Sequence, residues 1–301
     1  MSRAISPSTQ QRYGVVLVTE EFGVARSTYY AQRDSAGRPT PAAPQKRGPK
    51  TAFSDAVLLA HIRRVLEASP FLGEGHRKVW ARLRHVGIRT SKPRVLRVMR
   101  EAQLLAPSRA RRVAVPVTHD GTITTDRPDV MWGTDSTTAV TVEDGQVAVF
   151  VAVDHCTAEG VGIHAATAAT RYEALEPIRQ GVRAHFGGYG PQVATGLNLR
   201  HDHGSQYMSD LFQTELRFLG VTSSPAFVRM PEGNGVAERF IRTLKEQAIY
   251  GRTFRTAAEV RAAVAAFVAN YNAAWLVEKN GFRSPTRTRE AWNAAALPVA
   301  A

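Results

Sequence analysis

Cysteine is almost absent from this chain of 301 residues, which contains Cys156 alone. One cysteine excludes a framework of disulfides within the chain and any zinc site built from pairs of cysteines. No apolar run approaches the roughly 20 residues that a membrane-spanning helix needs. The N-terminal stretch MSRAISPSTQ also lacks the apolar core of a secretory signal. We therefore expect a protein of the reducing cytoplasm without a membrane segment.

Acidic residues are scarce in the first part of the chain. Residues 1–130 hold 23 Lys and Arg against 10 Asp and Glu, whereas residues 131–301 hold 16 of each kind. All of the net charge of +13 therefore lies in the N-terminal part. A basic region joined to a neutral one is typical of polyanion binding, and a nucleic-acid backbone is the leading candidate. Solubility alone would not require this segregation.

Two short helical patterns open the basic part. Residues 10–33 predict a helix, a turn at Gly23 and a second, polar helix, which is the outline of a helix-turn-helix. We assign residues 1–35 to this N-terminal helical segment. Residues 36–52 are rich in proline and basic side chains, and they predict an extended linker.

Three amphipathic patterns between residues 53 and 106 predict a second helix-turn-helix domain. Ser54 and Ser91 are the expected N-caps of its first and third helices, and Gly87 ends the second. The arginines of the third helix, Arg94, Arg97 and Arg100, are expected to face outward. The apolar stripe expected in the first helix consists of Val57, Leu58, Ile62, Val65 and Leu66.

We expect this domain to contact DNA through Arg77, Lys78, Lys92, Arg94 and Arg97. The alternative is a plain helical domain whose arginines only keep it solvated. Residues 107–128 are again basic, contain proline and show little periodicity, so they predict a second linker.

From residue 129 the pattern changes to strands. Residues 131–142, 146–153 and 160–165 predict three strands joined by short turns. Helical spacing and short strand-like stretches then alternate at 171–187, 192–201, 210–220, 221–224, 231–247 and 257–271. A polar, basic segment follows the last of these. This order predicts an α/β domain with a central mixed sheet, residues 129–292, ending in a helical extension.

Three acids stand where this fold could bring them together. Asp135 lies inside the first strand, Asp202 ends a later strand, and Glu238 is on the helix at 231–247, which Gly233 and Asn234 are expected to introduce as a turn. Clustered carboxylates repel unless a cation neutralises them, and oxygen ligands suit Mg²⁺ or Mn²⁺. Two such ions about 3.5–4 Å apart promote phosphoryl transfer. Because the chain has 26 acids, spacing alone leaves unrelated surface carboxylates as the alternative.

The residues around these acids carry a resemblance to a known family. WGTDST around Asp135, HDHGSQY around Asp202 and GNGVAERFIRTLK around Glu238 resemble the three catalytic motifs of bacterial insertion-sequence transposases with an integrase-type core. More narrowly, they resemble those of the second-reading-frame (OrfB) transposases, which are related to retroviral integrases. Their spacing of 35 residues between the second Asp and the Glu is met, and their basic residue seven positions after the Glu is Lys245. Two further stretches extend the resemblance over roughly residues 50–295: FLGEGHRKVWARLRHVGIRTSKPRVLRVMREAQLLAP and YNAAWLVEKNGFRSPTRTREAW.

The resemblance implies a ribonuclease H-like mixed-sheet core preceded by small all-α helix-turn-helix domains. It implies metal-dependent cleavage and transfer of DNA strands at the ends of an insertion sequence. Asp135, Asp202 and Glu238 would then hold Mg²⁺ or Mn²⁺, two ions per active site, and Lys245 would contact DNA. Arg242, His203 and Gln206 are further candidate DNA contacts, whereas Asp154, which ends the second strand, is expected to be structural.

The implied partners are DNA, further copies of the chain on that DNA, and an upstream-frame (OrfA) protein, in a nucleoid-associated setting. Two other functions fit part of the pattern. A catalytically silent DNA-binding regulator is disfavoured by the intact triad of acids. A ribonuclease H-type nuclease acting on hybrids is disfavoured by the two-part basic region and by Lys245.

Overall fold

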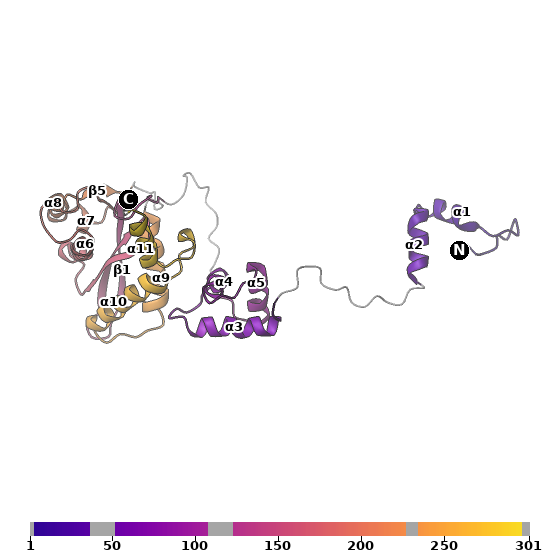
Figure 1. Ribbon diagram of the computed structural model, residues 1–301, viewed down its shortest axis with the longest axis horizontal. Helices are drawn as coiled ribbons and strands as arrows, with labels where there is room; N and C mark the ends of the chain where they lie inside the picture. The colour runs from indigo at the N-terminus through magenta and orange to yellow at the C-terminus, as the bar shows by residue number, and fades with distance from the viewer. Residues whose placement is uncertain (1–2, 37–51, 108–122, 227–233, 297–301) are drawn as a thin grey trace, which may run out of the picture. The chain divides into compact units, whose positions relative to one another are not determined.

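The computed structural model describes residues 3–36, 52–107, 123–226 and 234–296 (Figure 1). It divides into two compact units, Met1–Ala52 and Phe53–Ala301. Most of the two expected linkers and the segment 227–233 before the catalytic helix lie outside the described residues. The domain boundaries drawn through them therefore stay predictions.

The first unit contains the pair of helices that the sequence predicts. α1 (Gly14–Glu21) and α2 (Arg26–Ala36) are separated by a turn in which Gly23 has a φ of 61°. Glycine adopts this left-handed conformation without steric cost, which explains why the first helix ends there. Several apolar side chains of this unit are exposed, among them Leu17 at 53% and Phe22 at 61%.

The second unit begins with the predicted three helices, α3 (Asp55–Glu67), α4 (His76–His85) and α5 (Lys92–Glu101). Ser54 and Ser91 cap α3 and α5, each accepting a backbone N–H at 3.4 Å. Val57 is 45% exposed, so its place in the buried stripe was wrong: the helical repeat turns it toward solvent beside Leu58. The core of the three helices is formed by Leu58, Ile62, Val65, Val79, Leu83, Val95, Val98 and Met99.

This helical domain packs against the α/β part of the same unit. Phe71 lies in the main core and meets the ring of Trp275 edge-on at 4.8 Å. Arg82 pairs with the buried Glu74 and donates to the carbonyl oxygen of Ala274 at 3.3 Å. Aromatic packing and the hydrogen bond from Arg82 to Ala274 therefore join the two parts.

The α/β part is built on the expected mixed sheet. Its strands are β1 (Met131–Val140), β2 (Gln146–Asp154), β3 (Gly160–Ala166), β4 (Asn198–His201) and β5 (Thr222–Pro225). Their order is β3-β2-β1-β4-β5, with β1 antiparallel to β2 and parallel to β4. β1 is thus the central strand.

Helices cover both faces of this sheet (Figure 1). One face packs Val149 and Val151 against α9 (Gly235–Leu244) and α10 (Ala257–Ala274). The other packs Trp132 and Phe150 against α6 (Arg171–His185), α7 (Ser205–Met208) and α8 (Asp210–Leu219). Because both faces are buried, β2 is apolar at nearly every position rather than alternating.

Two helices and one irregular turn were not predicted. α7 replaces part of an expected loop, and α11 (Pro285–Ala296) replaces part of the polar tail. α9 leaves α-helical geometry at Leu244 and continues as a π-helical turn, Lys245–Ile249. Ser284, whose hydroxyl accepts the N–H of Arg287 at 3.4 Å, and Pro285 in the first turn were sequence signals for α11.

The crossing of α6 over β3 generates a stability prediction. A Cβ at Gly162 would lie 2.0 Å from the carbonyl oxygen of Pro177, so Gly162→Ala must displace backbone. We expect a loss of roughly 1–3 kcal/mol, which lowers the melting temperature by several degrees. Gly190→Ala is the control, because a Cβ there would meet nothing within 4 Å. Equal melting temperatures of the two variants would contradict the close helix–strand contact.

Candidate active site

The register of the central strands sets the first two acids side by side. β1 and β4 run parallel, with Trp132 opposite Leu199 and Gly133 opposite Arg200. Continuing this register by two residues places Asp135 level with Asp202, which directly follows β4. Parallel strands present the residues at their carboxyl ends to a common edge, where ligands bind in open α/β sheets.

The third acid reaches this edge on α9. A Cβ at Gly133 would lie 2.4 Å from Asn234 Oδ1 and 3.4 Å from Ala237 Cβ, so the helix approaches the strand at a glycine. Residues two apart in a strand share a face, which puts Asp135 on the side of α9 as well. Glu238 follows Ala237 and is exposed.

Asn234 ties the helix to the strand. Its side-chain Nδ2 donates to the carbonyl oxygen of Thr134 at 2.9 Å, and the residue is buried. Gly233, the other residue of the expected turn, lies outside the described residues, and the φ of −115° of Asn234 is not left-handed. Asn234 instead joins the first turn of α9 to the residue before Asp135.

The electrostatics show that the acids share one environment. Burial raises the pKa of Asp135 from its ordinary 3.8 to about 6, and the charges of Asp202 and Glu238 raise it as well. The backbone N–H of Ser136, which donates to Asp135 at 2.7 Å, and the charge of Lys245 act in the opposite direction. Ionising Asp135 therefore costs free energy in the folded chain, and the charges of the other two acids add to that cost.

The three carboxylates fit a hard divalent cation by their chemistry. Across the described residues, no three His, Cys, Asp or Glu side chains lie close enough to hold a metal ion as they stand. Asp135 and Asp202 each accept a backbone N–H with Oδ1, at 2.7 and 2.8 Å. These bonds orient the carboxylates, and a dication between them would remove the repulsion that raises the pKa of Asp135.

Several candidate DNA contacts surround the acids. Lys245 begins the π-helical turn and is close enough to lower the pKa of Asp135, while Arg242 is exposed on α9. A Cβ at Gly204 would meet both Gln206 Nε2, at 2.7 Å, and Asp202 Oδ1, at 2.9 Å, so Gln206 lies beside Asp202. His203 is exposed, with Nε2 2.8 Å from the carbonyl oxygen of Ala226.

Tyr207 is a residue of this site that sequence reasoning missed. It is fully buried on α7 and packs edge-on against Phe212 at 5.4 Å. Burial, and then the charge of Asp135, raise the pKa of its hydroxyl, which therefore stays protonated near Asp135. Its place in the motif HDHGSQY was the signal available in the sequence.

The five basic residues of the helical domain that were expected to contact DNA each have a contact within the protein. Arg94 and Arg97 both pair with Asp55, at 2.8 and 2.6 Å, and they lower its pKa. The Arg94 side chain is only 13% exposed, so its expected outward orientation was wrong: it joins α5 to the start of α3.

The other three expected DNA contacts in this domain, Arg77, Lys78 and Lys92, contact the α/β part or an aromatic ring. Arg77 pairs with Glu278 at 3.1 Å, and Lys78 Nζ lies 2.7 Å from the ring centre of Trp275. Lys92 Nζ lies 4.5 Å from the ring centre of Trp80.

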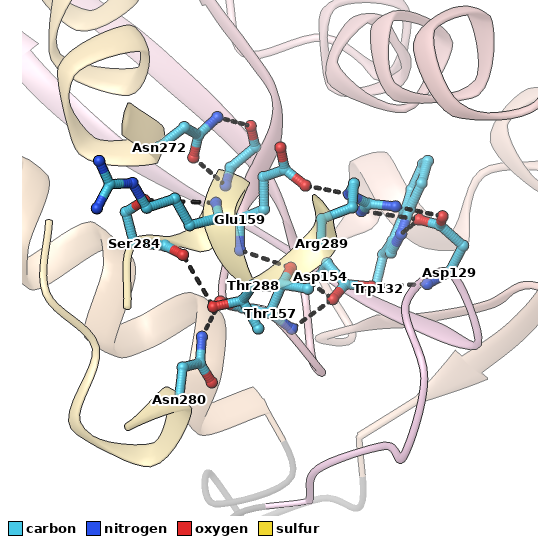
Figure 2. A network of polar contacts seen from close by, with 12 residues as sticks. Asp129, Trp132, Asp154, Thr157, Glu159, Asn272, Asn280, Ser284, Thr288 and Arg289 are labelled. Atoms are coloured by element: carbon cyan, nitrogen blue, oxygen red, sulfur yellow. Dashed lines mark hydrogen bonds and ion pairs between the residues drawn. The ribbon is translucent and has the colours of Figure 1, made fainter. Parts of the chain in front are cut away.

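A buried polar network supports the start of β1 (Figure 2). Asp154 accepts from the backbone N–H and the hydroxyl of Thr157, at 2.7 and 2.8 Å, and from the N–H of Asp129 at 2.9 Å. These contacts are those of a structural residue, as expected for Asp154. Trp132 Nε1 donates to Asp129 Oδ1 at 3.0 Å, so the network holds the strand that carries Asp135.

Arg289 of α11 completes this network (Figure 2). It pairs with Asp129, Nη1 to Oδ2 at 2.5 Å, and with Glu159. All three side chains are largely buried. Arg289 thus joins α11 to Asp129, which precedes β1, and to Glu159, which follows β2.

Comparison with known proteins agrees with this architecture. The family model described as "Integrase core domain" matches residues 219–275, which include Glu238 and Lys245, and the "HTH-like domain" model matches residues 53–112. The transposase for insertion sequence element IS629 of Shigella sonnei is 26% identical over 295 residues, 95% of each chain. Transposase InsD for insertion element IS2A/D/F/H/I/K of Escherichia coli is 29% identical over 204 residues, 65% of each chain.

The chain is homologous to insertion-sequence transposases over most of its length. It is a DDE-type transposase with a ribonuclease H-like core, whose mixed sheet has an antiparallel β3-β2-β1 part and a parallel β1-β4-β5 part. Among solved structures, a chain of the simian T-cell lymphotropic virus intasome with PP2A regulatory subunit B56 gamma aligns at a TM-score of 0.48 and 16% identity, covering 82% of this transposase and 78% of that chain. The HTLV-2 integrase catalytic core domain in complex with magnesium aligns at 0.39 and 14% identity, covering 55% and 98%. None of the described helices of the transposase combines the length and apolar composition that a bilayer crossing requires.

The raised pKa of Asp135 predicts how its neutralisation affects stability. Ionising Asp135 costs folding free energy above its folded pKa of about 6, whereas below the unfolded value of 3.8 both states are protonated and the cost vanishes. Asp135→Asn should therefore stabilise the metal-free transposase at pH 8 by about 1–2 kcal/mol, a few degrees in melting temperature.

Thermal unfolding at several pH values checks this. The advantage of the variant should shrink as the pH falls from 6 toward 4. Added Mg²⁺ should raise the melting temperature of the wild type but not of Asp135→Asn. A variant that is less stable than wild type at pH 8 without metal would contradict the unfavourable ionisation of Asp135.

Proposed function

We propose that this transposase cuts and joins DNA strands at the ends of an insertion sequence through Asp135, Asp202 and Glu238. The observation that carries the proposal is electrostatic: the charges of Asp202 and Glu238 both act on the partly buried Asp135. Asp135 and Asp202 accept the backbone N–H groups of Ser136 and Gly204, and Asn234 ties the start of α9, which carries Glu238, to the carbonyl oxygen of Thr134. This arrangement suits phosphoryl transfer better than a structural role.

The three acids would hold two Mg²⁺ or Mn²⁺ ions. When bound, such ions activate the attacking oxygen and stabilise the leaving oxygen of a phosphodiester. The protein supplies the orientation of the carboxylates through β1, β4 and α9. Lys245, whose charge reaches Asp135, would bind a phosphate of the strand that enters the site.

DNA is the proposed partner of both the acids and the basic N-terminal part. Lys245, Arg242, His203 and Gln206 lie on the elements that carry the acids, and we assign them to the DNA near the cut. Arg77, Lys78, Lys92, Arg94 and Arg97 would act mainly by setting a positive field around the helical domain, because each has a contact within the protein. We place the transposase at the nucleoid for the same reason.

Joining two element ends requires two active sites, so we propose a homo-oligomer on DNA. The exposed apolar side chains of the first unit, Val16, Leu17 and Phe22 among them, support a protein contact there. An upstream-frame partner is the other occupant that this surface would suit. A silent regulator and a ribonuclease H-type nuclease both fit the arrangement less well, since neither requires three acids beside a lysine and a basic DNA-binding domain.

The catalytic role of Glu238 can be tested with a charge-neutral variant. Glu238→Gln keeps the size of the side chain but removes a metal-binding oxygen, so strand joining on pre-cut element ends with Mg²⁺ should fall at least about 100-fold. Glu246→Gln, two turns further along, removes the same charge and is expected to retain most of the joining rate. Equal rates for wild type and Glu238→Gln would sink the proposal.

Phosphate binding can be tested through salt dependence. The affinity of the full chain for element-end DNA should fall steeply with salt concentration. Lys245→Gln should reduce the steepness of the plot of log binding constant against log salt concentration by about one, because it removes one phosphate contact. It should also lower the affinity for all DNA sequences alike. Arg171→Gln, on the helix that covers the opposite face of the sheet, should leave the slope unchanged. A flat response of the wild type would contradict phosphate binding.

A further inference from the structure

A cavity lies between the helical domain and the α/β part of the same unit. It has a volume of about 300 Å³ and is lined by α4, by the first residue of α5 and by the loop that follows Asn280. Its functional side chains are Trp80, Arg84, His85, Lys92 and Phe282. None of these belongs to the acidic site.

The aromatic side chains of this cavity are held in place. Trp80 and Phe282 meet at 5.8 Å between ring centres and 72° between planes. Trp80 Nε1 donates to the carbonyl oxygen of Thr90 at 2.8 Å, and Phe282 is only 9% exposed. An indole that is already fixed beside a cavity can stack on a flat ligand without a further loss of side-chain conformational entropy.

The charges at the cavity are all of one sign. Arg84 Cζ lies over the ring of Trp80, 4.9 Å from its centre. Lys92 Nζ lies 4.5 Å from the ring centre of Trp80 and 5.5 Å from that of Phe282. The described residues that line the cavity include no acid. Burial first, and then the nearby charges of Arg287 and Arg82, lower the pKa of His85. A ligand with a flat ring and a negative charge is complementary to such a lining.

We propose that this cavity binds one unpaired nucleotide of the DNA, with its base against Trp80 and its phosphate between Arg84 and Lys92. The inference rests on the proposed function, because cutting and joining strands leaves single-stranded flanks beside the duplex. A base within a duplex has both faces covered by its neighbours and cannot stack on Trp80, whereas an unpaired base can. About 300 Å³ is at the lower end of the volumes of small-ligand pockets, which suits one nucleotide rather than a base pair.

Photo-crosslinking tests the proposal directly. The full chain would be bound to branched element-end DNA that carries 5-iodouracil at one unpaired or one paired position. After irradiation, we expect DNA attached to the tryptic peptides 79–82 or 280–283, which contain Trp80 and Phe282. Crosslinking from the unpaired position should be at least about fivefold stronger than from the paired one, as expected for stacking. No crosslink to either peptide from any unpaired position would overturn the proposal.

Affinity measurements add charge-matched variants. Arg84→Gln should weaken binding of branched DNA about five- to tenfold while changing binding of fully paired DNA no more than about twofold. Lys92→Gln also removes a charge from the positive field around the helical domain, so it should weaken binding of both DNAs, and binding of branched DNA the more strongly. Arg100→Gln, exposed on α5, is the control and should affect the two DNAs equally. Equal effects of all three variants on both DNAs would contradict a nucleotide site. Displacement of the crosslinks by an acidic peptide but not by a single-stranded oligonucleotide would do so as well.

The catalytic variant separates this inference from the proposed function. Glu238→Gln should keep the crosslink, since Glu238 does not line the cavity. Joining by the wild type without any crosslink would sink the nucleotide pocket and leave the proposed function standing. A crosslink without metal-dependent joining by the wild type would sink the proposed function and leave the pocket standing.

Discussion

The parallel pairing of β1 with β4 is the constraint on which the site depends. Because Gly133 is opposite Arg200, Asp135 and Asp202 must lie level at one edge of the sheet. The same pairing puts Asp135 in a strand buried on both sides, which is why desolvation is the largest cause of its raised pKa. The fold thus holds acids that repel each other in one place, which lowers its own stability. A bound cation would remove that repulsion and stabilise the fold.

Elements far from the acids serve this arrangement. α9 can come close to β1 only because Gly133 has no side chain, and Asn234 then fixes the helix one turn before Glu238. At the start of the strand, Arg289 of α11 holds Asp129, which in turn accepts the indole N–H of Trp132. The acid-bearing strand is therefore held just before Asp135 by side chains from the last third of the chain.

Much of this could be predicted because it depends on local sequence. The strands, the capped helices and the acids at their ends follow from periodicity, capping residues and motif spacing. Arg94, Lys78 and Arg289 could not be placed in the same way, because a long cationic side chain on a helix can turn to solvent or to a partner such as Asp55, Trp275 or Asp129. The π-helical turn at Lys245 is equally hidden, since no residue such as proline or glycine marks it in the sequence Lys245–Ile249.

The contacts of the helical domain also reach the helix that carries the third acid. Lys78 on α4 lies over Trp275, Trp275 stacks with Tyr271 of α10 at 5.7 Å, and Tyr271 meets Phe240 of α9 at 4.8 Å. Phe240 is two residues from Glu238, so a continuous row of packed side chains joins α4 to the helix of Glu238. Cores packed in this way do not deform continuously. The separation between α4 and Glu238 is therefore set by this row of side chains within Phe53–Ala301.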